Sequence, residues 1–140
     1  MKAEELRIGN WVLSKGKPIQ VDEIFKAPDG WHDISCTKET HDLLEEVTPI
    51  PLTDEILLKA GFESYTSCYE KVYFDNDEKY NVFRVMFNDL GYWVILEQKH
   101  GIDADGNITW IGLNMGTYKY LHQLQNLYFA LTGEELEIKL

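Results

Sequence analysis

The chain has 140 residues, of which 44% are hydrophobic and 26% are charged, and it carries a formal net charge of −11. Length and composition exclude a disordered or fibrous chain and indicate a globular protein with a core of its own. Acidic residues are spread along the whole chain. Their excess argues against direct binding to DNA or RNA, because lysine and arginine neutralise nucleic-acid phosphates.

Residues 1–50 show short runs of strand-forming residues separated by turn signals. Gly9-Asn10, Lys15-Gly16 and Pro28-Asp29-Gly30 mark the turns, and apolar residues alternate with polar ones over residues 19–25. Short strands at this spacing predict an N-terminal β-rich lobe over residues 1–50, built as a small bent sheet or an SH3-like partial barrel.

A short helix is predicted directly after residue 51. Thr53 is a good N-cap residue, and Gly61 supplies the left-handed position that ends many helices. Phe62 can then fold back on Leu57. Both ends of this helix are specified by local sequence.

From residue 65 to residue 113 the pattern returns to strands. Runs at 72–74, 80–87, 92–96 and 108–113 predict an antiparallel meander of about four strands. Residues 120–132 predict an amphipathic helix that packs on this meander, and residues 135–140 alternate like a terminal edge strand. The expected fold is therefore α+β, with a second lobe over residues 51–140 and both lobes in one compact unit.

The apolar stripe of the C-terminal helix is predicted from the spacing of its large side chains, which are Leu121, Leu124, Leu127, Tyr128 and Leu131. A second row carries His122, Gln125, Asn126 and Phe129, and residues 120–133 contain no charged side chain. Two interpretations follow. Either the row is covered within the protein and bonds neighbouring main chain, or it is an interaction face for a protein partner or a second copy of the chain.

No motif in the sequence specifies a chemical site. Cys36 and Cys68 have no CxxC partner, and the four histidines lack metal-ligand spacing. The segment 103–107 (DADGN) begins like a calcium loop, but it lacks the glycine and the glutamate that such a loop requires, so a hairpin turn is favoured. The sequence also lacks a nucleophile elbow and a phosphate-binding glycine loop. We therefore predict no catalytic residue, no cofactor and no metal site.

The tryptophans allow two readings as well. Trp11, Trp31, Trp93 and Trp110 could stack against a base or a sugar, but a core position with a bonded indole N–H is the favoured interpretation.

The sequence contains no segment that marks a membrane span or export. The longest apolar run covers residues 92–96, far short of the roughly 20 residues that cross a bilayer. The N-terminal residues 1–6 have no apolar signal region. We expect a cytoplasmic protein without membrane contact.

Three segments carry a resemblance: residues 6–12 (LRIGNWV), 49–53 (PIPLT) and 122–136 (HQLQNLYFALTGEEL). Together they resemble a family of short uncharacterised proteins of Bacteroidetes genomes and of their phages and mobile elements. The resemblance implies a cytoplasmic, phage-related setting and no particular chemistry. More weakly, residues 6–25 resemble the opening of SH3-like or KOW-type small barrels, whose basic residues contact RNA. Here Lys15 and Lys17 are offset by nearby acidic residues.

The sequence favours a non-enzymatic binding or adaptor module that acts through protein–protein contacts. The alternative is a nucleic-acid-associated regulator, or an acidic protein that imitates DNA and occupies a basic protein. A hydrolase of unknown type is the third possibility.

Overall fold

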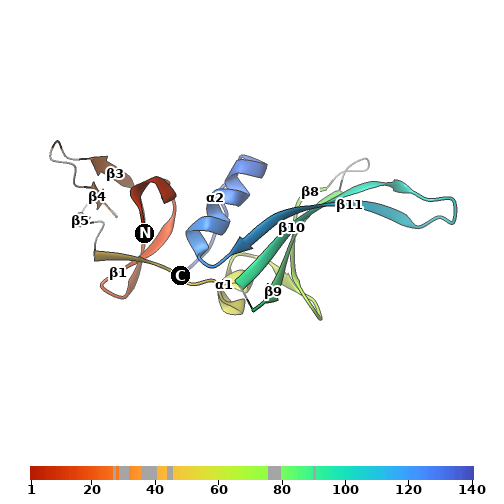
Figure 1. The fold of residues 1–140 in the computed structure, drawn as a ribbon, viewed down its shortest axis with the longest axis horizontal. Coiled ribbons are helices and arrows are strands. Elements are labelled where there is room, and N and C mark those ends of the chain that lie inside the picture. The colour runs from red at the N-terminus through yellow and green to blue at the C-terminus, as the bar shows by residue number, and fades with distance from the viewer. Residues whose placement is uncertain (27, 29–31, 36–40, 44–45, 76–79, 90) are drawn as a thin grey trace. The chain divides into compact units, whose positions relative to one another are not determined.

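The computed structural model describes residues 1–26, 28, 32–35, 41–43, 46–75, 80–89 and 91–140. Figure 1 shows these residues as a ribbon. The fold is α+β, as the sequence predicted: antiparallel sheets are combined with two α-helices. In the described part of the chain, no helix combines the length and the apolar character that a membrane crossing requires.

The chain divides into two compact units. Unit 1 contains Met1–Leu52, Tyr120–Ile138 and Leu140, and unit 2 contains Thr53–Lys119 and Lys139. The boundary near residue 52 lies close to the expected boundary at residue 50. The C-terminal helix differs from expectation, because it groups with the N-terminal segment rather than with the strands that precede it.

Unit 1 contains two small antiparallel sheets and a short 3-10 helix, η1 (Ala3–Glu5). One sheet has the order β2-β1-β6 and the other β3-β4-β5. Their strands are β1 (Trp11–Ser14), β2 (Lys17–Gln20), β3 (Glu23–Lys26), β4 (His32–Ser35), β5 (His41–Leu43) and β6 (Val47–Pro49). The prediction of short strands is confirmed for these segments. Asp29 and Gly30 of the predicted turn, together with Trp31 and Cys36, lie outside the described residues.

The core of unit 1 is a cluster of buried aliphatic side chains from the turns and strands: Leu6, Val12, Val21 and Val47. Helix α2 (Leu121–Thr132) belongs to the same unit and ends at Gly133, whose φ of 76° is left-handed. Its buried face holds Leu121, His122, Leu124, Gln125 and Tyr128. The buried face of α2 therefore includes His122 and Gln125 of the predicted second row, whereas Leu131 of the predicted apolar stripe is exposed.

The predicted terminal edge strand over residues 135–140 is wrong. These residues form no strand, although Leu136 and Ile138 are buried and the residues on either side of Ile138 are exposed. The alternating pattern reports which side chains are buried, and an extended segment can satisfy it without pairing to a neighbouring strand.

Unit 2 begins with helix α1 (Asp54–Lys59), and both of its predicted ends are confirmed. The Thr53 hydroxyl accepts a hydrogen bond from the Ile56 N–H at 3.2 Å. Gly61 has a φ of 78°, and the Phe62 N–H donates to the Leu57 carbonyl at 3.1 Å. This 6→1 bond is the mark of a Schellman C-cap, for which glycine is favoured because it has no Cβ.

The sheet of unit 2 is an antiparallel meander with the order β11-β10-β9-β8-β7, as predicted but with longer strands. Its strands are β7 (Glu63–Ser64), β8 (Tyr69–Asp75), β9 (Tyr80–Asn88), β10 (Gly91–Ile102) and β11 (Ile108–Tyr118). Phe83 and Val85 are fully buried, whereas Phe87, two residues further along β9, is 69% exposed.

The β10–β11 hairpin extends beyond the other strands of its sheet (Figure 1). β10 pairs with β9 as far as Gln98 but continues alongside β11 to Ile102. The connecting turn confirms the interpretation of residues 103–107. One Asp103 carboxylate oxygen accepts from the Asp105 N–H at 3.0 Å and from the Asn107 N–H at 2.8 Å.

Candidate functional site

The second row of α2 meets the N-terminal segment of unit 1 through side-chain amides. The Gln125 amide oxygen accepts from the Trp11 N–H at 2.9 Å, and its nitrogen donates to the Gly9 carbonyl at 3.3 Å. One amide thus bridges the two peptides on either side of Asn10, as a residue of a neighbouring strand would. The Asn126 amide nitrogen donates to the Glu5 carbonyl at 2.8 Å.

His122 lies beside these amides and is only 1% exposed. Its ring stacks on Tyr120, with centroids 5.9 Å apart and an interplanar angle of 10°. Neither ring nitrogen has a hydrogen-bond partner among the described residues. Burial lowers the pKa of His122, and the Glu5 charge opposes this only in part, so the imidazole is held neutral.

Phe129 completes the row and is 37% exposed. The Arg7 guanidinium lies 3.7 Å from the centre of the Phe129 ring, and an Arg7 nitrogen forms an ion pair with Glu135 at 2.7 Å. These contacts join residues of unit 1. They support the first interpretation of the sequence, in which the row bonds main chain of its own protein.

A second group of polar side chains lies on the sheet of unit 2. Arg84 of β9 forms ion pairs at 2.7 Å with Glu70 of β8 and with Glu97 of β10. The Cys68 thiol donates to Glu70 at 3.5 Å, and burial, reinforced by Glu70, raises the pKa of Cys68. A thiol that remains protonated is a poor nucleophile. The group therefore has the character of a cross-strand ion-pair network rather than of a catalytic centre.

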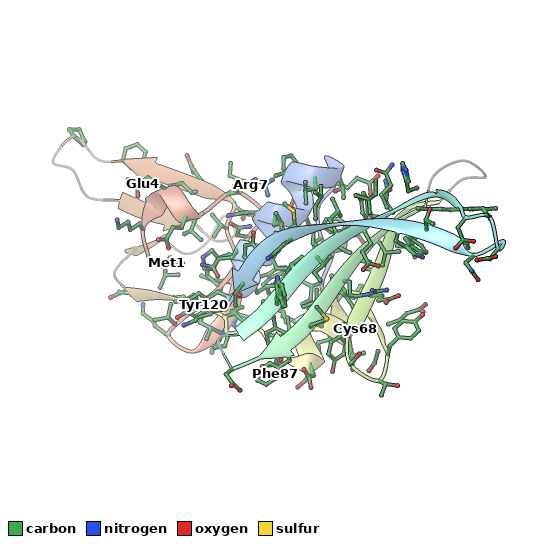
Figure 2. The ribbon with its side chains drawn as sticks, turned by 45° about the vertical axis from the view of Figure 1, so that its right-hand side comes forward. Met1, Glu4, Arg7, Cys68, Phe87 and Tyr120 are labelled. Atoms are coloured by element: carbon green, nitrogen blue, oxygen red, sulfur yellow. The ribbon has the colours of Figure 1, made fainter. Side chains whose placement is uncertain are left out.

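A pocket of about 330 Å³ opens in unit 2 beside α1 and the start of β8. Its wall combines one carboxylate, aromatic rings and small polar side chains: Asp54, Tyr65, Thr66, Ser67, Cys68, Tyr69, Phe87 and Tyr92. Cys68 and Phe87 are labelled in Figure 2 and belong to the same end of the sheet, where Tyr69 pairs with Val85.

Two phenols are oriented toward the carboxylate of this pocket. The Tyr92 hydroxyl donates to Asp54 Oδ1 at 2.8 Å. Burial raises the pKa of Tyr92 to about 12, and Asp54 adds to the effect. The pKa of Tyr69 is also raised, by burial and then by its hydrogen bond to Asp54. Both phenols therefore stay protonated and can donate hydrogen bonds to the Asp54 side chain.

The sheet of unit 2 also has an edge that lacks a second neighbour. Among the described residues β11 pairs with β10 alone. Its exposed apolar side chains include Ile108, Ile111 and Leu113, which are 50%, 48% and 57% exposed.

Sequence reasoning placed its candidate residues on the helix that unit 1 uses internally, and it did not identify the pocket. In the sequence, Asp54 follows the predicted N-cap Thr53, and Tyr92 begins the apolar run of residues 92–96. Neither pattern indicates that they meet. The core interpretation of the tryptophans is wrong for Trp110, which is 42% exposed, whereas Trp11 and Trp93 are half-buried. In the described part of the chain, no three His, Cys, Asp or Glu side chains are grouped to hold a metal ion.

Comparison of the chain with protein-family models, with curated proteins and with solved structures gives no match. The functional argument therefore depends on the geometry of the two units alone.

Proposed function

We propose that this protein is a non-enzymatic binding module that acts through protein–protein contacts, and that the contact is made at the β11 edge of unit 2. The observation that supports it is an edge strand of 11 residues, Ile108–Tyr118, without a single charged side chain. An exposed strand of this kind offers main-chain N–H and C=O groups to another strand.

The absence of charge is what distinguishes this edge. Soluble proteins protect edge strands with lysine, proline, bulges or inward charges. β11 has no charge and no proline, and its one-residue register shift at Met115 lies beyond Ile111 and Leu113, which are exposed at a spacing of two residues, on one side of the strand. An edge of this length without charges is suited to pairing rather than to exclusion of other strands.

The partner that we propose is a second copy of the chain. Two chains with a net charge of −11 repel each other, and contact costs least where the surface has no acidic residues. Antiparallel pairing of β11 with β11 of another copy is two-fold symmetric, so each copy contributes the same strand. The setting that we propose is the cytoplasm, in the phage-related context implied by segments such as residues 122–136.

The test is the molar mass in solution over a range of protein concentrations, at low and at high salt. We expect mass to rise from monomer toward dimer with concentration. The dimer should strengthen at high salt, because salt screens the repulsion between two acidic chains. A basic protein partner would show the opposite salt dependence.

The double variant Ile111→Lys/Leu113→Lys is expected to remain monomeric. It makes the chain less acidic by two charges, so loss of association would report the edge itself and not general repulsion. Val72→Lys is the control for an added lysine away from β11, because Val72 is 43% exposed on β8, and it should leave association unchanged. A wild type that stays monomeric at every concentration and salt, or a double variant that dimerises like wild type, contradicts the proposal.

A further inference from the structure

The pocket of unit 2 combines features that recur where proteins bind a positively charged organic group. Aromatic rings surround one carboxylate, and no lysine, arginine or histidine belongs to the wall. The volume of about 330 Å³ is that of a small-molecule site rather than of a water cavity.

The mouth of the pocket exposes apolar rings. Phe87 is 69% exposed and Tyr65 is 53% exposed, although both belong to the pocket wall. Phe87 meets Tyr92 edge to face, with centroids 5.4 Å apart and an interplanar angle of 61°. Figure 2 shows Phe87 at the margin of the sheet, where β9 ends. Aromatic faces carry partial negative charge and attract cations within about 6 Å of the ring centre.

We propose that this pocket binds an organic cation, an alkylated ammonium or a guanidinium group. Asp54 supplies the negative charge, and Tyr65, Tyr69, Phe87 and Tyr92 supply the rings. The group belongs either to a free small molecule or to a basic side chain of a partner protein. The inference is independent of the β11 edge.

The electrostatics select against other ligand classes. An anion is repelled by Asp54, and a metal ion requires more oxygen ligands than one carboxylate provides. A neutral polyol would have to compete with the Tyr69 and Tyr92 hydroxyls for the Asp54 oxygens. A methylated ammonium has no such requirement, because it interacts through charge and ring contacts without donating a hydrogen bond. The net charge of −11 also concentrates cations near the protein.

The experiment is an NMR titration of the full chain with choline and with 3,3-dimethyl-1-butanol, its neutral isostere. We expect choline to shift tyrosine resonances of the pocket saturably, and the isostere to bind at least about tenfold more weakly, because it has the shape of choline without the charge. Parallel titrations use peptides with trimethyllysine, unmodified lysine or arginine. A peptide that binds about tenfold more tightly than the free cation indicates a partner protein as the source, and equal affinity indicates a small molecule.

Two variants test the assignment of residues. Asp54→Asn keeps the side-chain volume and removes the charge, and it should weaken cation binding about tenfold. Phe87→Ala removes a ring that is 69% exposed, and it should weaken binding severalfold while lowering the unfolding temperature by only a few degrees through loss of the contact with Tyr92. Glu55→Gln removes the same charge one residue away, outside the pocket wall, and should leave binding unchanged.

Three results would overturn the inference. The first is equal binding of choline and its neutral isostere. The second is the absence of any saturable shift with the free cations and with the basic peptides. The third is unchanged binding in both Asp54→Asn and Phe87→Ala. None of these results depends on the mass measurements of the β11 variants, so the two proposals can fail separately.

Discussion

Two neighbouring segments of the chain lack charge, and the two units use them in opposite ways. Residues 120–133 form α2 and its end, and unit 1 bonds the amides of Gln125 and Asn126 to its own main chain. Residues 108–118 form β11, and unit 2 leaves several of their apolar side chains exposed. A segment without charge therefore indicates a contact, but not whether that contact is internal or external.

The reason for the difference lies in the length of the strands. The strands described in unit 1 have three or four residues, so main-chain groups at their ends need partners from elsewhere, and α2 supplies amides to them. The four long strands of unit 2 have 7 to 12 residues and bond one another along most of their length. Their unpaired groups are left at the edges, where another chain can reach them.

The largest effect is expected for Gln125→Leu, which removes the hydrogen bonds between α2 and the main chain of the N-terminal segment. The substitution leaves the half-buried Trp11 N–H without its acceptor, whereas the Gly9 carbonyl keeps a hydrogen bond from the Gln20 amide at 3.0 Å, and the substitution should lower the free energy of unfolding by about 1–3 kcal/mol. Urea denaturation measures this loss. Gln98→Ala is the control, because Gln98 is an exposed amide on β10 and its loss should cost less than about 0.5 kcal/mol. Equal stability of the Gln125 variant and wild type would show that the amide bridge is dispensable.

A smaller loss of stability is expected when the glycines that end α1 and α2 are replaced. Both glycines, Gly61 and Gly133, adopt a left-handed conformation. Gly61→Ala should cost about 1–2 kcal/mol, since its Cβ would add strain at a φ of 78° and would lie 2.8 Å from the Lys71 amine. Gly133→Ala shares the strain at a φ of 76° but meets no atom within 4 Å, so it should cost about 1 kcal/mol. Thermal unfolding of the two variants compares them, and a Gly61→Ala protein as stable as wild type would rule out the C-cap.

The smallest change in stability is expected for His122→Leu, which is compared with Gln125→Leu on the same helix. Both side chains are 1% exposed on the same helix, but the His122 nitrogens have no partner among the described residues. Replacement by leucine should therefore change stability at pH 7.5 by less than about 1 kcal/mol, or increase it.

The pH dependence follows from the lowered pKa of His122. The unfolded chain takes up a proton near pH 6.5, whereas the folded chain resists protonation, so stability is complete above that pH and falls as the pH decreases. The slope for one proton is at most about 1.4 kcal/mol per pH unit. His122→Leu should remove this contribution between pH 7 and pH 5 in urea denaturation series. An unchanged slope would show that another group controls the acid response.

The sequence by itself determined the elements whose signals are local. Thr53 and Gly61 specify the ends of α1 through contacts no more than a few residues away, and the run of strand-forming residues at 80–87 identifies β9. Gly133 ends α2 in the same way. These features follow from hydrogen bonds and backbone conformations that neighbouring residues set among themselves.

Only the tertiary structure decided which surfaces are covered. The grouping of α2 with the N-terminal segment depends on bonds between residues more than 100 positions apart, such as Gln125 to Trp11. The meeting of Asp54 with Tyr92 depends on how β10 lies beside α1, 38 positions apart in sequence. The exposure of β11 depends on its place at the end of the strand order. Periodicity and composition record the preference of a side chain for burial or for water, whereas the partner it meets is set by chain topology.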